Sequence, residues 1–265
     1  MEQLGGFTAL LFAARSGDVE MARLLLDSEA DIETVAGNET SALVIATHSG
    51  HPGLAELLLE RGANANTIGA GYTALHAAIL RGDLETVNAL LAHGADPEAR
   101  LLRPNPVQRA SEDWSLKGPM VGATPYWLAA SFREADIMRA LVEGRADPTA
   151  TNKGRLSIPR NREDREFYTA KVVSGFESSL QAAIRGDSTR SRYYVQPNPD
   201  PAGEQRLALD AVLAAVEHGV DLNHRDFSES TALHDAAARK LPNIIRELAE
   251  RGADVNALNA QGQTP

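Results

Sequence analysis

The sequence predicts an all-α solenoid of stacked helix-turn-helix repeats, with β-hairpin or turn connections and two inserted segments. A Thr or Ser followed by Ala-Leu recurs at spacings of 33 and 32 residues, at Thr8, Ser41 and Thr73. A glycine follows each of them and marks the turn between two helices. Hydrophobic residues make up 43% of the chain but aromatic residues only 5%, so Ala and Leu must fill thin interfaces between stacked helices.

Residues 72–97 show one repeat in its clearest form. The hydroxyl of Thr73 can accept a hydrogen bond from a free amide in the first turn of a short helix, which ends at Gly82-Asp83. A second helix follows, with one apolar face formed by Leu84, Val87, Leu90 and Leu91. Gly94 lies where this helix must end in a left-handed residue. Neither helix can bury its apolar face alone, so the repeat requires neighbours.

Residues 1–100 contain three such repeats. The first runs from about residue 5 to residue 37, and the second from about residue 38 to residue 68. Glu29 stands where the first repeat should have a glycine, so its second helix ends either with strain or with a different closure. Pro52 falls in the first turn of a second helix, where proline is tolerated because that N–H has no partner in the helix.

The register is lost at residues 101–121, which contain three prolines and no helical period, and we expect this segment to form an elongated finger. The fourth repeat covers residues 122–150. In this repeat Trp127 occupies the position where other repeats have His. Arg145 replaces the terminal glycine, and we expect Gly144 to take that role one residue early.

Residues 151–226 are predicted to form a degenerate fifth repeat with a long insertion at 155–206. Residues 151–195 hold nine Lys or Arg against five Asp or Glu, so the insert is basic. We expect a short amphipathic helix within 176–184, an exposed turn at 196–201 and a second helix at 207–217.

The sixth repeat covers residues 227–258, with Pro242 opening its second helix. Residues 259–265 match the opening of a seventh repeat and stop at the Thr-Pro that should start its first helix. We therefore expect the sequence to be a section of a longer protein.

Short motifs recur in register with these repeats: Thr73-Ala-Leu-His76, Thr231-Ala-Leu-His234, Gly94-Ala-Asp96 and Gly252-Ala-Asp-Val-Asn256. With a period near 33 residues, the sequence resembles the ankyrin-repeat family. The resemblance implies a protein-interaction scaffold, as one section of a longer, bacterial repeat protein. In such an array, adjacent rigid repeats hold side chains from several hairpins on one curved surface. It also implies that His76 and His234 hydrogen-bond to backbone and connect neighbouring repeats.

In this family the hairpin tips and the exposed edge of the first helices form a concave, partner-binding face. The matching positions here are Phe7, Arg15, Thr40, His48, Tyr72, Leu80, Arg81, Phe132, Ser230 and Arg239. Burial inside a repeat does not explain why Tyr72, Leu80 and Phe132 are apolar or aromatic, because we expect these residues to face outward. Grouped aromatic and Arg side chains are typical of interaction hot spots. One alternative stays open, in which these three side chains pack under the inserted segments, especially 101–121 with Trp114 and Met120.

The sequence contains no complete motif for catalysis, a cofactor or a metal, so we expect no enzymatic activity. Gly69-Ala-Gly71-Tyr-Thr-Ala74 matches part of a dinucleotide-binding loop, but no strand precedes it and its register is that of a hairpin. His48 and His51 straddle a turn, and no carboxylate or thiol completes a metal site around them. Arg81-Gly-Asp83 and Arg185-Gly-Asp187 are interpreted as structural turns rather than adhesion motifs.

The net charge of −10 argues against broad nucleic-acid binding, because an acidic surface repels phosphate, and it favours a partner with a basic patch. The chain contains no cysteine, which excludes disulfides. No apolar run approaches the ~20 residues that span a bilayer. No targeting segment is recognisable, and the compartment, the partner and the oligomeric state stay open.

Two other functions stay open beside the scaffold. The array could serve only as a spacer or stabilising arm for a catalytic or redox domain outside this sequence. Alternatively, the basic insert could contact an anionic ligand or nucleic acid through Arg190, Arg192, Tyr193 and Tyr194. A basic cluster this small is more often a solvated loop or a counterion for an acidic scaffold.

Overall fold

A computed structural model describes residues 6–103, 116, 120–152, 155–157, 171–174, 176–186 and 201–265. Within these residues twelve helices form six consecutive pairs. The first three pairs are α1 (Ala9–Ser16) with α2 (Val19–Asp27), α3 (Ala42–Ser49) with α4 (Pro52–Glu60), and α5 (Ala74–Arg81) with α6 (Leu84–Ala92). The others are α7 (Pro125–Ser131) with α8 (Ala135–Glu143), α9 (Ser179–Arg185) with α10 (Pro201–Glu217), and α11 (Ala232–Ala238) with α12 (Pro242–Glu250).

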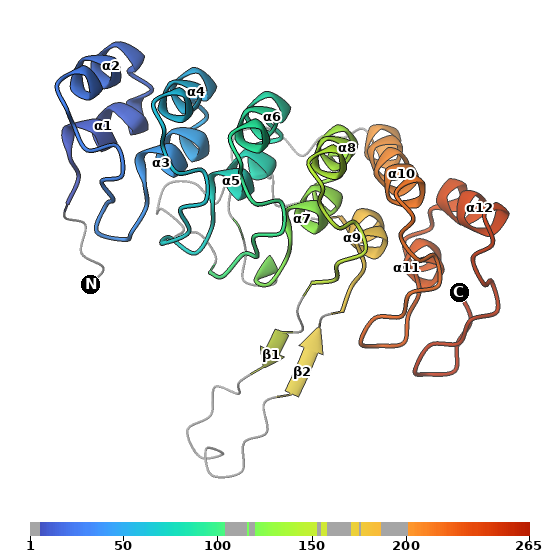
Figure 1. Cartoon of the computed structure of the whole chain (residues 1–265). Coiled ribbons are helices and arrows are strands. Elements are labelled where there is room, and N and C mark those ends of the chain that lie inside the picture. The colour runs from blue at the N-terminus through green and yellow to red at the C-terminus, as the bar shows by residue number, and fades with distance from the viewer. Residues whose placement is uncertain are drawn as a thin grey trace, which may run out of the picture.

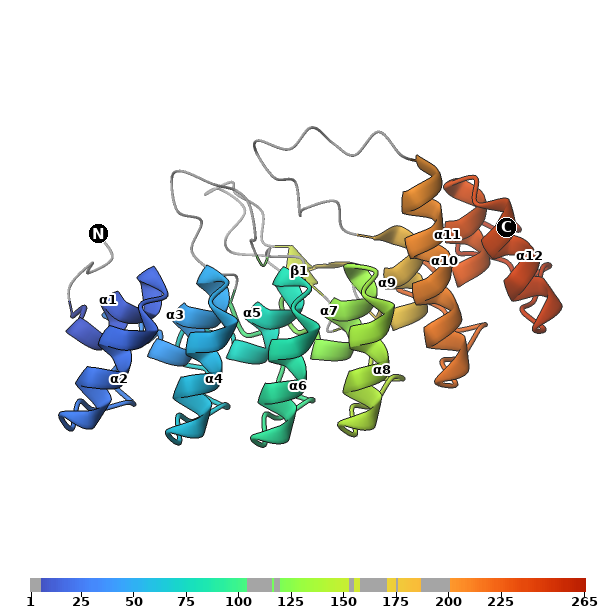
Figure 2. The ribbon, with the colours of Figure 1, turned by 90° about the horizontal axis from the view of Figure 1, so that it is seen from above.

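The six pairs stack side by side into a solenoid (Figure 1). The first helices of the pairs form one row and the second helices form another, and each helix packs on its counterpart in the next pair. Figure 2 shows α2, α4, α6 and α8 running nearly parallel along the second row. One continuous buried cluster, rich in Ala and Leu, extends through the stack. The prediction of an all-α solenoid is therefore confirmed.

Each first helix begins at a Ser or Thr, as the sequence predicts. The side-chain oxygen of this residue accepts a hydrogen bond from an amide in the first turn at Thr8, Ser41, Thr73, Thr124 and Ser178. These caps satisfy donors that a short helix leaves free. The starts of the helices are thus set by residues close to them in the sequence.

Left-handed residues end the helices, but not always at glycine. Gly82 (φ 67°) and Gly94 (φ 79°) behave as predicted. Glu29 takes the left-handed conformation itself (φ 64°), which settles its open question in favour of strain. The expectation for Gly144 is wrong, because this residue has φ −75° and Arg145 is the left-handed residue at φ 71°. The left-handed geometry recurs at the same place in each repeat and outweighs the preference for glycine there.

The fifth pair differs most from the predicted pattern. Strands β1 (Arg155–Ser157) and β2 (Lys171–Ser174) pair antiparallel ahead of α9, within the insertion predicted at 155–206 (Figure 1). Helix α9 is buried on nearly all sides rather than amphipathic, because α7, α10 and α11 pack around it. Helix α10 begins at Pro201, six residues before the predicted start, with proline again in a position that needs no N–H. Residues 187–200, including the predicted basic contacts, lie outside the described residues.

Most of the predicted finger at 101–121, including Trp114, also lies outside the described residues. At its base, the Leu101 amide donates to the Ala123 carbonyl (3.0 Å) and the Gly122 amide donates to the Leu101 carbonyl (2.7 Å). Leu116 and Met120 are each only 1% exposed and belong to the main buried cluster. The inserted segment therefore contributes side chains to the core.

Candidate protein-interaction surface

Four of the ten residues expected on the concave face are buried. The exposed fraction is 5% for Thr40, 5% for Tyr72, 0% for Leu80 and 6% for Phe132. The prediction that Tyr72, Leu80 and Phe132 face outward is therefore wrong. The Ala-rich first helices allow neighbouring pairs to approach closely, so larger side chains at the edge of a helix fill the interface between pairs.

Burial is the part of the alternative interpretation that the structure shows for these three residues. Tyr72, Leu80 and Phe132 share one buried cluster with Met120 of the inserted segment. The ring of Tyr72 lies 6.2 Å from that of His48, and burial raises the pKa of Tyr72 to about 12. These side chains stabilise the solenoid and are not available to a partner.

The other six expected residues are not buried. Arg15 and Arg239 are exposed, whereas the remaining four are half-buried: Phe7, His48, Arg81 and Ser230. The Arg81 guanidinium donates to the backbone carbonyl of His48 (2.9 Å), so this side chain joins two helix pairs. Arg81 thus has a structural role that the sequence pattern did not indicate.

The same kind of contact joins other pairs. A ring nitrogen of His51 lies 3.1 Å from the Arg15 carbonyl at the end of α1. Arg133 donates to the carbonyls of Ala183 and Ile184 at the end of α9, both at 3.2 Å. Each side chain satisfies carbonyls that the last turn of a neighbouring helix leaves free. In sequence, these residues could have been noticed as basic or His side chains beside the turns between helices.

Exposed apolar side chains gather instead in the connections between helix pairs. We call them the hairpin-edge row: Val35, Leu102, Phe176, Phe227 and Leu258, which are between 41% and 57% exposed. In Figure 1 these connections hang below the row of first helices, so their tips lie along one side of the solenoid. Scattered exposed apolar residues need no explanation, but these five recur in the connections of the array, so the row is a candidate interaction surface.

Phe176 has an unusual backbone. It lies two residues before the N-cap Ser178, with φ 58°. The residues two before the N-caps of the other first helices also have positive φ, and they are Gly or Glu: Gly6, Glu39, Gly71, Gly122 and Glu229. A left-handed aromatic residue is strained, and such strain persists only where surrounding contacts hold it. One such contact is the 2.5 Å approach of His224 Nε2 to the Phe176 carbonyl.

A charged cluster fixes the two connections that carry Phe176 and Phe227. Arg185 on α9 donates to Glu177 (2.5 Å), to Asp226 (2.6 Å) and to Asp235 (2.8 Å). Glu177 follows Phe176, and Asp226 precedes Phe227. The guanidinium therefore ties both hairpins to the first helices of the last two pairs, so the two exposed rings are held on a rigid frame.

In this Arg185 cluster, burial and ion pairing shift the pKa values in opposite directions. Burial raises the pKa of Glu177 and of Asp235, although the Arg185 charge pulls both in the opposite direction. For Asp226, burial alone would raise the pKa, but hydrogen bonds from Arg185 and Ser228 outweigh it and lower the pKa. Burial likewise acts to lower the pKa of Arg185, but its three carboxylate partners raise it. The cluster is therefore held together by Arg185.

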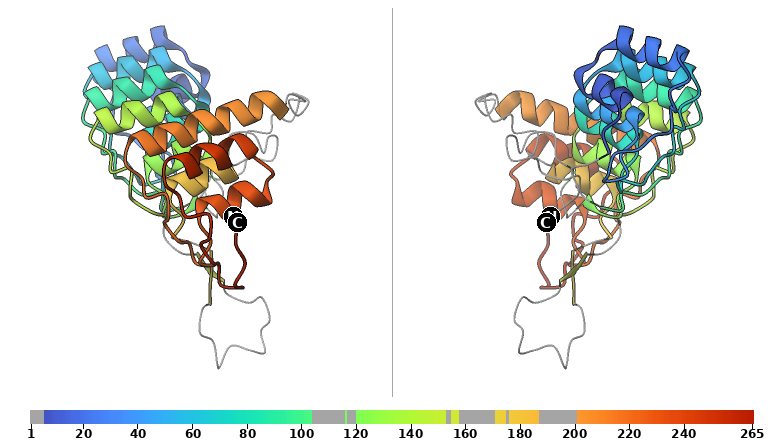
Figure 3. Two further views of the ribbon diagram at one scale, coloured as in Figure 1. Left: turned by 90° about the vertical axis from the view of Figure 1, so that its right-hand side faces the viewer. Right: turned by 90° about the vertical axis from the view of Figure 1, so that its left-hand side faces the viewer.

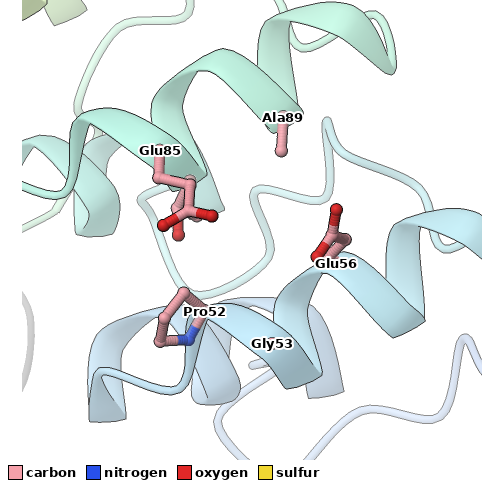
Figure 4. A pocket seen from close by; sticks show the side chains of 6 residues that line it. Pro52, Gly53, Glu56, Glu85 and Ala89 are labelled. Atoms are coloured by element: carbon pink, nitrogen blue, oxygen red, sulfur yellow. The ribbon is translucent and has the colours of Figure 1, made fainter.

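A small pocket lies between α4 and α6, away from the hairpins (Figure 4). Its volume is about 90 Å³, and it is lined by Pro52, Gly53, Glu56, Glu85, Thr86 and Ala89. Sites for organic ligands are typically larger than about 300 Å³. The pocket is too small for such a ligand.

Comparison with known families agrees with the observed architecture. A family described as ankyrin repeats (3 copies) matches residues 10–101 and 70–152, and one described as ankyrin repeats (many copies) matches residues 216–265. The B-cell lymphoma 3 protein homolog of mouse is 40% identical over 195 residues, which are 73% of this chain and 38% of the mouse protein. The BCL-6 corepressor-like protein 1 of mouse is 31% identical over 137 residues, which are 45% of this chain and 8% of that protein. The chain thus spans well under half the length of these relatives.

Solved structures share the fold over nearly the whole chain. The crystal structure of the ankyrin repeat domain of Bcl-3, titled a unique member of the IkappaB protein family, has a TM-score of 0.66 and 22% identity. The match covers 98% of this chain and 92% of that one. At this identity the likeness shows the fold alone. Both curated relatives are from mouse, so they give the expected bacterial origin no support. No helix among the described residues is long and apolar enough to cross a membrane.

Proposed function

Because the chain belongs to the ankyrin-repeat family, we propose that it is a non-catalytic protein-interaction scaffold that binds its partner along the hairpin side of the solenoid. The proposed site is the hairpin-edge row. It replaces the face centred on Tyr72, Leu80 and Phe132, whose side chains are buried.

The observation that carries this proposal is the pair of exposed aromatic rings on the connections that precede α9 and α11. Phe176 is 50% exposed and Phe227 is 48% exposed. Aromatic side chains supply a large contact area, and a few such anchors provide most of the binding energy in protein interfaces.

Rigid display supports the same function. The Arg185 cluster and the contact from His224 to the Phe176 carbonyl fix the hairpins before any partner arrives. Little conformational entropy is then lost on binding, which favours affinity. The partner would offer apolar pockets for the rings. Basic residues on it would complement the acidic chain.

The test is affinity capture from the native extract, followed by direct binding of the captured protein to purified variants. We expect Phe176→Asn together with Phe227→Ser to weaken binding at least about 30-fold, the effect of removing one hot-spot side chain. Asn is suitable at position 176 because it tolerates the left-handed conformation.

Leu207→Ser provides the matched control, because Leu207 is 49% exposed on α10 and lies outside the hairpins. The control should bind like the parent chain, and circular dichroism should show that all variants keep their helices. A captured protein that binds the double variant as tightly as the parent would exclude the hairpin-edge row as the site.

A further inference from the structure

A two-stranded sheet stands apart from the helices of the solenoid. Strands β1 and β2 pair antiparallel with each other, and Figure 1 and both views of Figure 3 show them below the two rows of helices. Among the described residues, no backbone hydrogen bond joins either strand to another part of the chain. Each strand therefore has an outer edge on which no other described strand lies.

A pair of strands is an incomplete sheet. Two antiparallel strands by themselves are at best marginally stable in water, and a third strand or a packed helix is needed for independent stability. The N–H and C=O groups along an outer edge recur at the spacing of an extended chain, so such an edge is a template for another strand. The chemistry of the edge thus selects an extended segment as its occupant.

The two outer edges are not equivalent. Arg155 of β1 pairs with Ser174 of β2. The next residue of β1, Leu156, pairs with Val172, so Val173 of β2 has no counterpart on β1. An extra residue of this kind is a β-bulge, which bends its strand and interrupts regular pairing, and bulges protect an edge from added strands. Strand β1 has no extra residue in this register, so its edge is the better template.

The charge of the strands indicates which kind of segment fits. Arg155 lies on β1 and Lys171 lies on β2, and neither strand contains an acidic residue. Residues 151–195 hold nine Lys or Arg against five Asp or Glu, in a chain whose net charge is −10. Like charges opposite each other destabilise a strand pair, whereas opposite charges stabilise it. A second copy of this sheet is therefore a poor occupant, and an acidic strand is a good one.

We propose that the edge of β1 binds an acidic, extended segment of a partner protein, which pairs with residues 155–157 as a third strand. In this mode of recognition, main-chain hydrogen bonds supply the affinity and side chains supply the selectivity. The site is distinct from the hairpin-edge row, where the rings of Phe176 and Phe227 are exposed. The two sites adjoin, because β2 ends at Ser174, but they favour opposite charges on the bound segment.

The test is the binding of labelled synthetic peptides to the full chain, measured by fluorescence anisotropy. The probe is a short peptide of alternating Glu and Thr, since Thr favours strands. One control peptide has Lys in place of each Glu, and a second is N-methylated throughout, so that it cannot donate to a strand. Because β1 offers few hydrogen bonds, we expect a dissociation constant of about 10 to 500 µM for the probe and at least about tenfold weaker binding of both controls.

A charge-swapped chain tests the site itself. Arg155→Glu with Lys171→Glu should weaken binding of the acidic peptide at least about tenfold and strengthen binding of the Lys peptide by a similar factor. Arg23→Glu with Arg246→Glu is the matched control, because it changes the net charge equally at exposed positions of α2 and α12. This control should leave both dissociation constants unchanged.

Hydrogen exchange locates the bound peptide, since the amides of residues 155–157 should exchange more slowly when the acidic peptide is present. Phe227→Ser should leave peptide binding unchanged, so this proposal and the hairpin-edge row can fail separately. Equal binding of the N-methylated peptide would show that charge alone attracts it, and would overturn strand addition. Tighter binding of a single-stranded oligonucleotide, or no binding of the acidic peptide to the parent chain up to about 1 mM, would overturn it as well.

Discussion

The stability that one buried residue contributes can depend strongly on pH, as His76 shows. Its ring is 0% exposed, and its Nδ1 accepts a hydrogen bond from the Thr73 amide (3.1 Å) beside the Thr73 hydroxyl (2.8 Å). Burial lowers the pKa of His76 to about 4, with the Ala99 backbone acting weakly in the opposite direction. The ring is therefore neutral in the folded chain at neutral pH, whereas in the unfolded chain it titrates near 6.5.

The sign of the pH effect follows directly. Because the folded pKa lies below the unfolded one, the stability that His76 contributes is complete above pH 6.5 and is lost as pH falls toward 4. The full effect is on the order of 3 kcal/mol. We expect His76→Asn, which keeps an acceptor for the Thr73 amide, to remove this dependence.

Urea unfolding of the parent and of His76→Asn at a series of pH values measures this pH dependence of the unfolding free energy. The difference in unfolding free energy between the two proteins should shrink as pH falls from neutral to 4. A difference that stays constant over this range would mean that the ring is not held neutral by burial.

Between neighbouring helix pairs, stability depends on close approach as well as on apolar contact. Gly50 ends α3 with φ 81°, and the Arg81 guanidinium lies directly over it while donating to the His48 carbonyl. A Cβ at position 50 would occupy the space of the guanidinium. Gly94 has a similar φ of 79° but no atom within 4 Å of an added Cβ.

This pair of glycines gives a matched prediction. Gly94→Ala should destabilise the chain by about 1 kcal/mol, the strain of a left-handed alanine. Gly50→Ala should destabilise it by about 3 kcal/mol, because it adds the loss of a hydrogen bond from a charged donor. Denaturant midpoints measure both changes. Equal losses of unfolding free energy in the two variants would show that Arg81 moves aside at no cost in stability.

The sequence predicted the helix pairs well, because their starts and ends depend on neighbouring residues. Thr73 and Pro52 have the positions expected of them, but the left-handed residue near Arg145 was misplaced by one residue and the start of α10 by six. Exposure was predicted poorly. Tyr72, Leu80 and Phe132 are buried because neighbouring pairs approach closely, and a repeat pattern does not say how much of a side chain at the edge of a helix the next pair covers. Phe176 and Phe227 were missed because the expected face was assigned only from positions of the repeat motif.

As a whole, the molecule is a linear array in which each pair contacts mainly its neighbours. Stability in such an array is nearly a sum of local terms, so one end can open while the other stays folded. The last pairs depend strongly on Arg185, the cation that joins Glu177, Asp226 and Asp235. The first three pairs have no such central charge among their described residues and depend on stacked Ala and Leu.

Arg185→Met should therefore destabilise the C-terminal part of the solenoid selectively. It leaves three largely buried carboxylates without their cation, a change that typically removes roughly 3 kcal/mol. Hydrogen exchange should quicken in α9 and α11 and stay unchanged from α1 to α6. Arg61→Met is the control, because the pair of Arg61 with Asp27 is 32% and 57% exposed and contributes little. Equal quickening along every helix would show that the solenoid opens as one unit, and the hairpins of Phe176 and Phe227 would then owe their rigidity to the whole array rather than to Arg185.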